Sequence, residues 1–240
     1  MEKLDYLLWG PVNRAALLEA LSGLDVVALT LQLAADVPDP PLLLGRGPEL
    51  GALVQVWLRS YQSRPAVEAA LPGEFDGYLV TESEVQPLVD RDWPDGEPSP
   101  GISHVSWFPK PSRLTEEEFL HGWHEVHSPH SAALHPLRLT YLRDTVVRTL
   151  TPGSPPVRAV VVERFRDDRD YLDPSRLFGA PDAFEQNLRD LPGYADLDDL
   201  SCRPMHEVVL RSGHARAAQE CHPIGGAWEA DNTGSKGAVT

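Results

Sequence analysis

The sequence FLHGWHEVHSPH, residues 119–130, places four of the chain's nine histidines and a tryptophan within twelve positions. Phe119, Trp123 and His127 are spaced by four residues, so in a helix they project to one side. A histidine on the apolar side of a helix is suited to general acid–base chemistry, because its pKa can be tuned within the physiological range. The alternative is a structural role, in which His127 only hydrogen-bonds a nearby backbone group.

The same stretch does not have the spacing of a zinc site. The HExxH motif needs two histidines four residues apart, whereas His124 and His127 are three residues apart. Pro129 cannot donate a helical hydrogen bond and disfavours helical angles at Ser128, so a break or kink is predicted at residues 127–129. We therefore expect no metal ligands here.

Further side chains could share a pocket with His127. Tyr141, on the next predicted strand, could donate a hydrogen bond to a substrate or could simply pack in the sheet. His104 and Trp107 have opposite parity on the strand before the helix, so at most one of them faces the pocket. His206, on the last predicted strand, is another candidate. The predicted catalytic residues are His127 and Tyr141, and the predicted substrate contacts are Trp123, Phe119, His104 and Trp107.

Strand and helix signals recur in the order β-α-β-β-α-β twice along the chain. Thr115 and Glu118 form a capping-box pattern that begins the helix carrying His127. The elements of the first half are predicted at 4–10, 13–23, 25–34, 50–60, 63–73 and 75–87, and those of the second at 102–110, 115–136, 137–151, 155–167, 181–191 and 201–212.

This order is that of the ferredoxin-like arrangement, in which two helices cover one face of a four-stranded antiparallel sheet. We therefore predict an α+β protein of tandem ferredoxin-like repeats: a first half at 1–90, a linker at 91–101, a second half at 102–212 and a polar tail at 213–240. Two such sheets packed face to face form a barrel whose interior could be the binding pocket. One chain could close this barrel, or partner subunits could cover the bare faces. The sequence therefore allows either a monomer or a homodimer.

Composition and motifs disfavour several partners and cofactors. A formal net charge of −15 and a pI near 4.9 disfavour nucleic acid, and no apolar run approaches the roughly 20 residues of a membrane span. The start MEKLDYLLWG lacks the pattern of a secretion signal, so the cytoplasm is expected. Dinucleotide-binding, P-loop and serine-nucleophile motifs are absent. Cys202 and Cys221 form no CxxC pair, and the charged segment 166–176 is predicted to be a solvated loop.

The segment LTEEEFLHGWHEVHSPHSAALHPLRLTYLRDTVV resembles the EthD domain, a branch of the dimeric α+β barrel superfamily. The marker of that family is a helix with the pattern F-x-x-x-W-x-x-x-H-x-P, followed by a strand that carries a tyrosine. Phe119, Trp123, His127, Pro129 and Tyr141 match this pattern in order and spacing. The resemblance covers about residues 102–212, whereas the first half matches only in element order and has no WxxxH counterpart.

The resemblance implies a pocket for a hydrophobic, often aromatic, ligand and a histidine that transfers protons. Families of this superfamily include cofactor-independent anthrone-type oxygenases, aromatic polyketide cyclases and decarboxylases. We therefore expect an enzyme that acts without metal or organic cofactor on a hydrophobic aromatic or polyketide-like molecule. Lyase chemistry (decarboxylation, dehydration or cyclisation) is the leading expectation, because it needs only proton transfer and enolate stabilisation. The alternatives are a cofactor-free oxygenase and a non-catalytic accessory protein that binds a small molecule.

Overall fold

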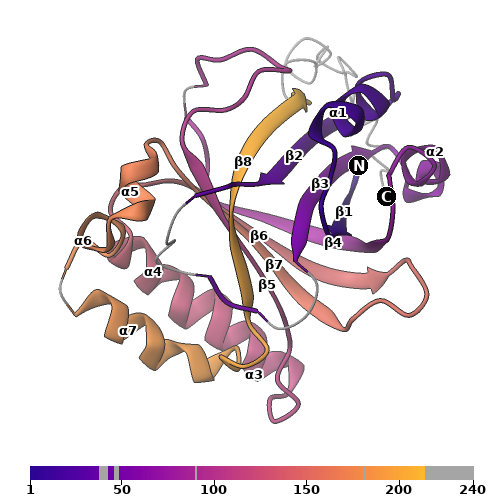
Figure 1. The fold of residues 1–240 in the computed structure, drawn as a ribbon. Coiled ribbons are helices and arrows are strands. Elements are labelled where there is room, and N and C mark those ends of the chain that lie inside the picture. The colour runs from indigo at the N-terminus through magenta and orange to yellow at the C-terminus, as the bar shows by residue number, and fades with distance from the viewer. Residues whose placement is uncertain (38–42, 46–48, 90, 181, 214–240) are drawn as a thin grey trace, which may run out of the picture.

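Antiparallel pairing joins the eight strands of the described residues into one closed barrel (Figure 1). The computed structural model describes residues 1–37, 43–45, 49–89, 91–180 and 182–213. Around the barrel the strand order is β1-β3-β2-β8-β5-β7-β6-β4, and β4 pairs back to β1. The strands are β1 (Glu2–Trp9), β2 (Ala28–Ala34), β3 (Leu50–Leu58), β4 (Phe75–Gln86), β5 (Ile102–Pro109), β6 (Arg138–Thr149), β7 (Val157–Phe165) and β8 (Ser201–Arg211).

Each half of the chain supplies four neighbouring strands with the same internal order. The first half runs β4-β1-β3-β2 and the second runs β8-β5-β7-β6, while the pairs β2–β8 and β4–β6 join the two halves. The predicted β-α-β-β-α-β order is confirmed in both halves. Because the barrel closes within one chain, the sheet faces need no partner subunit to cover them.

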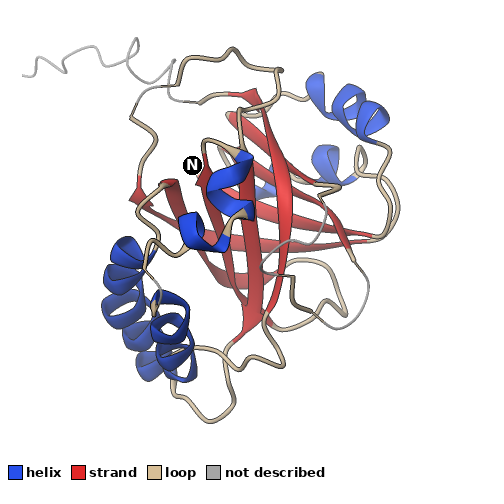
Figure 2. Ribbon diagram, turned by 60° about the vertical axis from the view of Figure 1, so that its left-hand side comes forward, coloured by secondary structure: helices blue, strands red, loops and turns tan. Residues whose placement is uncertain are grey.

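Helices lie outside the barrel, on two sides of it (Figure 2). α1 (Arg14–Ser22) and α2 (Pro65–Glu68) cover the first half, whereas α3 (Glu116–Leu120), α4 (Ser128–Leu134) and α7 (Ala183–Asp190) cover the second. Successive side chains of a strand point to opposite faces of a sheet. Each strand therefore presents one set of residues to the helices and the other set to the barrel interior.

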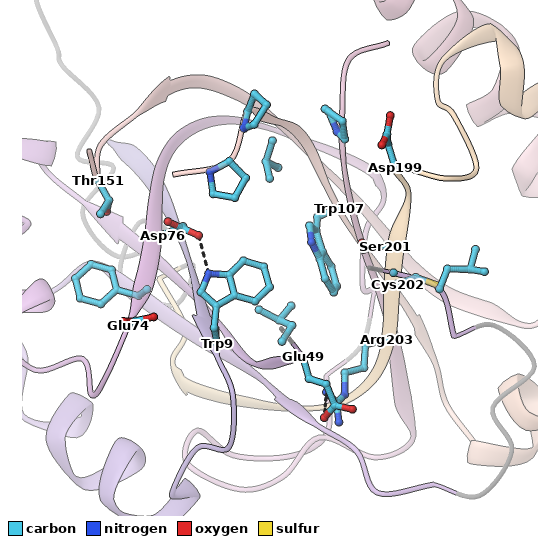
Figure 3. A pocket seen from close by; sticks show the side chains of 18 of the residues that line it. Trp9, Glu49, Glu74, Asp76, Trp107, Thr151, Asp199, Ser201, Cys202 and Arg203 are labelled. Carbon is cyan, nitrogen blue, oxygen red and sulfur yellow. Dashed lines mark hydrogen bonds and ion pairs between the residues drawn. The ribbon is translucent and has the colours of Figure 1, made fainter. Parts of the chain in front are cut away.

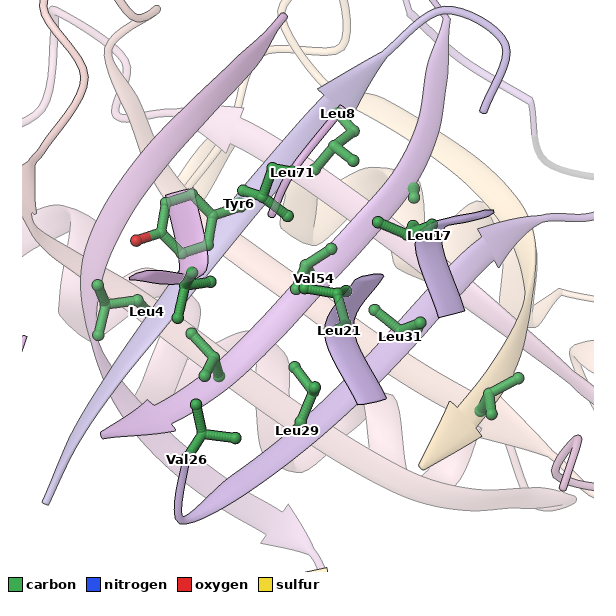
Figure 4. Close-up of a cluster of buried hydrophobic side chains, with 14 of the residues drawn as sticks. Leu4, Tyr6, Leu8, Leu17, Leu21, Val26, Leu29, Leu31, Val54 and Leu71 are labelled. Atoms are coloured by element: carbon green, nitrogen blue, oxygen red, sulfur yellow. The ribbon is translucent and has the colours of Figure 1, made fainter. Parts of the chain in front are cut away.

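The helix layer of the first half is a packed core. Leu17 and Leu21 of α1 are fully buried in one cluster with Leu4, Leu29 and Leu31 of the strands (Figure 4). Full burial of one leucine side chain stabilises the folded state by about 1.5–3 kcal/mol. This cluster therefore anchors α1 to the outer face of the barrel.

The barrel interior is filled with side chains over its middle. Leu7, Leu53, Tyr78, Val105 and Val162 point inward and are fully buried in a second cluster. An eight-stranded barrel has an interior just wide enough for side chains to fill. The middle of the interior, between the two halves, is therefore packed, and no binding pocket lies there within the described residues.

Of the break or kink predicted at residues 127–129, the break does not occur. The chain continues from α3 through a π-helical segment, η2 (His121–His127), directly into α4. In a π-helix a backbone N–H bonds to the carbonyl five residues earlier, and Ser128 N donates to Trp123 O in this way. Pro129 then falls in the first turn of α4, where a missing N–H costs little.

The segment 166–176 forms two short helices and not the solvated loop that its charges predicted. α5 (Asp168–Leu172) and α6 (Pro174–Leu177) each begin at an aspartate whose side chain accepts a hydrogen bond from the helix start. Tyr171 in α5 is fully buried among aromatic and aliphatic side chains. The aspartates cap helices here, and the apolar residues between them hold the segment on the barrel. The predicted tail, including Cys221, lies outside the described residues from residue 214 onward.

Candidate active site

A cavity of about 380 Å³ lies between the second helix layer and the outer face of the second half of the barrel. Outward-facing residues of β5 to β8 form its floor, and η2, α4, α7 and the segment after α7 form its roof. The cavity is thus on the opposite face of the sheet from the predicted pocket. The floor includes His104, Ser106, Phe108, Tyr141, Val161, Glu163 and Cys202, and the roof includes Trp123, His127, Ser131, His135, Phe184, Leu188, Leu191 and Tyr194.

A polar row crosses the floor at one end of the cavity. His104 of β5 lies opposite Glu163 of β7, and Glu163 lies opposite Tyr141 of β6. Residues directly opposite on one face have Cβ atoms about 4.5–5.5 Å apart, so these three side chains are neighbours. Further along β5, the rings of Phe108 and Trp123 are 5.5 Å apart between centroids. The cavity therefore has a polar end and an aromatic end.

An ion pair fixes the polar end. The side chain of Arg138, 1% exposed, pairs with Glu163 and donates to Ser131 Oγ at 2.6 Å. Burial alone would raise the pKa of Glu163, but the charges of Arg138, His135 and His104 lower this pKa to about 2. Glu163 is therefore a carboxylate at neutral pH, and Arg138 balances its charge.

His127 ends the π-helical segment and forms part of the cavity roof. It is 8% exposed, and its ring packs against Tyr194 with centroids 4.5 Å apart. Its Nδ1 atom lies 3.8 Å from Asp190 Oδ2, which is too far for a hydrogen bond but close enough to attract an imidazolium. Burial lowers the pKa of His127 to about 4, although Glu163 and Asp190 act in the opposite direction. The ring is therefore neutral at pH 7 and can accept a proton.

Two further imidazoles line the same cavity. His104 Nδ1 lies 3.1 Å from the Tyr171 hydroxyl, and burial lowers the pKa of His104 to about 4. His135 Nδ1 lies 2.9 Å from the Leu177 carbonyl oxygen. Because a carbonyl can only accept, His135 Nδ1 carries a proton and Nε2 is left for other partners.

The Tyr141 hydroxyl is hydrogen-bonded to the helix above it. Ser128 Oγ donates its proton to Trp123 O at 2.9 Å, so the Tyr141 hydroxyl, 3.1 Å from Ser128 Oγ, donates to Ser128. Arg143 donates to the same Ser128 oxygen at 2.7 Å. Burial raises the pKa of Tyr141, which keeps the phenol neutral. Tyr141 could donate a hydrogen bond to a substrate only after its hydrogen bond to Ser128 had broken. Its oxygen can accept a hydrogen bond from a substrate while the bond to Ser128 is kept.

Four of the six predicted site residues line the cavity. Phe119 does not, because it is fully buried behind Trp123, with 5.7 Å between the ring centroids. Trp107 lies on the other face of β5, as its parity requires, and borders a hollow at the barrel end. His206 is not among the lining residues either, and its Nδ1 lies 3.4 Å from Gly101 O. The four residues that line the cavity are His127, Tyr141, Trp123 and His104.

Comparisons with known proteins address the fold. No protein-family model matches the chain, and no curated protein matches its sequence. Among solved structures, one described as an anthrone oxidase-like protein matches with a TM-score of 0.53 and 10% sequence identity, over 88% of this chain and 94% of that chain. The two proteins share a fold. Because identity is so low and no family model matches, the EthD resemblance stays a prediction.

The fold shared with the anthrone oxidase-like protein brings together residues that sequence patterns missed. Glu163 is a charged residue in the otherwise apolar strand VRAVVVERF, and its position in the alternating pattern points it to the outer face of the sheet. This pattern could have identified Glu163 as a candidate site residue. Arg138 and His135 are adjacent to the predicted helix end and gave no periodic signal. Tyr194 reaches the cavity from the turn after α7, and Asp190 at the end of α7 lies beside His127; only the tertiary structure positions these two residues.

Exposed apolar side chains form part of the cavity wall. Leu43, Phe184, Leu188 and Leu197 line the cavity and are 60%, 42%, 40% and 51% exposed. α7 carries two of them and has only Ala183 as a fully buried residue. Large exposed apolar side chains gathered around a hollow indicate a surface that binds something apolar.

Other chemistry at the cavity is restricted by its surroundings. Burial raises the pKa of the Cys202 thiol to about 12, so it stays protonated and is a poor nucleophile. Within the described residues, no three His, Cys, Asp or Glu side chains are grouped as metal ligands would be.

In the same part of the chain, no helix is both long and apolar enough to cross a membrane.

Proposed function

We propose that the protein is an enzyme that removes a proton from a hydrophobic aromatic molecule in this cavity, and that O₂ then oxidises the resulting carbanion. The proposal rests on one observation. His127, His104 and His135 line one cavity together with Glu163, which is paired with Arg138, and aromatic side chains form the adjacent wall. The repeated element order supports a tandem ferredoxin-like origin of the barrel, which is the architecture that the EthD resemblance implies.

The cavity suits a flat, apolar ring system. A volume of about 380 Å³ falls within the usual range of small-molecule sites, roughly 300–1,000 Å³. Phe108, Trp123 and Tyr194 provide aromatic walls, and an aromatic pair contributes about 0.5–1.5 kcal/mol beyond its area of contact. A bound apolar ligand would also cover the exposed side chains of Phe184 and Leu188, which water now surrounds in part.

His127 is the proposed base. It would take a proton from an acidic C–H group of the substrate, and Asp190, 3.8 Å away, would stabilise the imidazolium that forms. A positioned general base typically contributes about 10²–10⁴-fold to the rate. In the proposed tautomer His104 would accept from Tyr171 at Nδ1, carry its proton on Nε2 and donate to a substrate oxygen, where negative charge develops.

The oxidation balances without a further reductant. The carbanion passes one electron to O₂, and the substrate radical and superoxide combine into a peroxide anion, which the His127 imidazolium protonates. The neutral imidazole then removes the second proton of the same carbon, the O–O bond breaks, and hydroxide leaves and takes that proton as water. The sum is R₂CH₂ + O₂ → R₂C=O + H₂O, and His127 ends in its starting state.

The likeness to the anthrone oxidase-like protein favours oxidation over the lyase reactions that the sequence predicted. Anthrones have an acidic CH₂ group beside aromatic rings, so they need only a base and O₂. Decarboxylation, dehydration or cyclisation could begin at the same base but would consume no O₂. Oxygen consumption therefore separates the two classes of reaction.

Anthrone itself is the probe that tests the proposal. We expect ketone formation with one O₂ consumed per product, with one atom from ¹⁸O₂ in the product and no turnover under nitrogen. His127→Gln should lower kcat by about 100-fold or more and leave the Kd for anthrone within about tenfold. His121→Gln, at an exposed position of the same π-helical segment, is the control and should keep the rate. Binding of anthrone with no O₂ consumption and no ketone formation would contradict the proposed oxidation and would leave a lyase for another substrate or a carrier.

A further inference from the structure

We infer that the open end of the barrel is a second binding site, and that it takes an organic cation with an apolar body. A groove of about 1020 Å³ lies where β1 and β5 end and where β3, β4, β7 and β8 begin (Figure 3). Its lining residues differ from those of the histidine-lined cavity except for Leu43, Leu44 and Cys202. The inference does not rest on the proposed oxidation.

Each half of the molecule contributes one tryptophan to the groove. Trp9 ends β1 and Trp107 lies near the end of β5, and these strands are the first of their respective halves. The two indole rings lie side by side in an edge-to-face contact, with 6.0 Å between centroids and an angle of 60° between planes (Figure 3). Both tryptophans are partly exposed and line the groove. The face of an indole attracts a cation, and exposed indoles are common contacts of substituted ammonium groups.

Three carboxylates without an ion-pair partner among the described residues line the groove. Asp76 accepts a hydrogen bond from Trp9 Nε1 at 2.6 Å, which fixes the orientation of that ring. Glu74 and Asp199 also line the groove, and no described residue forms an ion pair with these three carboxylates. Glu49 is paired with Arg203 at 3.0 Å, so that pair adds no net charge. The groove therefore carries three uncompensated negative charges and two partly exposed indoles.

The charges and the apolar surface together define the class of ligand. An anion would be repelled by Asp76 and its neighbours, and a neutral molecule would gain no charge attraction from the carboxylates or the indoles. Leu50 and Val157 are buried beneath the groove, and four prolines border it, which gives a rigid apolar surface for the rest of the ligand. A substituted ammonium ion that carries a ring or an alkyl body fits this combination.

The test compares two probes that differ in charge and not in shape. Choline and its uncharged isostere 3,3-dimethylbutan-1-ol are titrated into the full chain at low ionic strength, and Kd is measured by calorimetry. We expect choline to bind about tenfold more tightly than the isostere. Asp76→Asn keeps an acceptor for Trp9 and removes the charge, and should weaken choline binding about three- to tenfold. Trp107→Leu should weaken it by about tenfold or more, and Trp107→Phe should do so less.

Two controls distinguish binding in this groove from an effect of net charge and from binding in the histidine-lined cavity. Asp92→Asn removes an exposed carboxylate outside the groove and should leave the Kd for choline unchanged, which excludes an effect of net charge alone. His127→Gln should also bind choline like the wild-type chain, so loss of oxidase activity and loss of this site are distinguishable. The inference is overturned if the isostere binds as tightly as choline, if Asp92→Asn weakens binding as much as Asp76→Asn, or if folded Trp107→Leu and Trp107→Phe variants both bind choline normally.

Discussion

Burial sets the protonation state of His127, and that state decides what the residue can do. The cavity removes water from the ring, so its pKa falls to about 4 even though Glu163 and Asp190 attract a proton to it. In the empty site the ring is therefore ready to accept a proton at neutral pH. Once a substrate has become an anion beside it, that charge stabilises the imidazolium, and the proton stays until the peroxide takes it.

Asp190→Asn tests the contribution of the neighbouring carboxylate at the level of single residues. The carboxylate raises the pKa of His127, so its removal should move the acid limb of kcat/KM from near pH 4 to lower pH. The imidazolium would also be less stabilised, so the plateau of kcat should fall about three- to tenfold. The measurement is the pH profile of turnover, with Glu185→Gln on the exposed side of the same helix as the control. An unchanged limb together with an unchanged plateau would contradict the role of Asp190.

The sequence predicted the part of the site that lies on one helix and one strand. Trp123 and His127 could be placed together because helical spacing is local, and parity separated His104 from Trp107 for the same reason. Glu163 and Asp190 could not be placed, because their contacts depend on strand pairing and on a turn far along the chain. The predicted donor role of Tyr141 also needed structure, since only the fold shows that Ser128 is its partner.

At the scale of elements, the π-helical segment is what holds the cavity roof. Thr115 and Glu118 form the predicted capping box, because capping depends on residues only three apart. The path of the helix through Pro129 could not be predicted, because it depends on a backbone that widens over His121–His127. Gly122 lies within this segment, and a Cβ atom there would be 2.1 Å from Gly193 O. The helix can therefore approach the turn after α7 only because residue 122 has no side chain.

Gly122→Ala should separate the helix from that turn. We expect it to destabilise the folded state by about 1–3 kcal/mol and to weaken anthrone binding, because Leu191 and Tyr194 would be displaced from the cavity wall. Gly23→Ala is the matched control, since nothing lies within 4 Å of its added Cβ, and its stability should change by less than about 1 kcal/mol. Urea unfolding of the two variants checks the prediction. Equal midpoints for both would show that the close approach of Gly122 has no energetic role.

At the scale of the whole molecule, barrel closure encloses charged groups that a single sheet would leave in water. Lys3 donates to Asp144 at 2.7 Å, and Gln55 Nε2 lies 3.0 Å from Asp144 and 3.5 Å from Asp5. Asp5 Oδ2 and Asp144 Oδ1 have no hydrogen-bond partner among the described residues, and a proton on Asp5 could be shared with Asp144. Burial and the charge of Asp144 raise the pKa of Asp5 well above its usual value.

Asp5→Asn should therefore stabilise the protein at neutral pH. A raised pKa in the folded state means that the wild type loses stability as pH rises from about 4, because the unfolded chain releases the Asp5 proton first. The amide removes this loss, so the variant should gain about 1–3 kcal/mol at pH 7 and much less at pH 4. Asp144→Asn should have the opposite effect and destabilise by up to about 3–5 kcal/mol, because Lys3 loses a buried partner. Urea unfolding of both variants at pH 4 and pH 7 checks these predictions. If Asp5→Asn is less stable than the wild type at pH 7, Asp5 does not share a proton with Asp144 in the folded state.

Proton removal by His127 is the step on which the functional proposal depends, and it can be measured without the oxidation. In D₂O under nitrogen, the CH₂ protons of anthrone should exchange for deuterium in the presence of the protein, as followed by mass spectrometry. We predict that His127→Gln slows this exchange by about 100-fold or more, whereas His121→Gln leaves it unchanged. Exchange in His127→Gln at the wild-type rate would show that His127 is not the base.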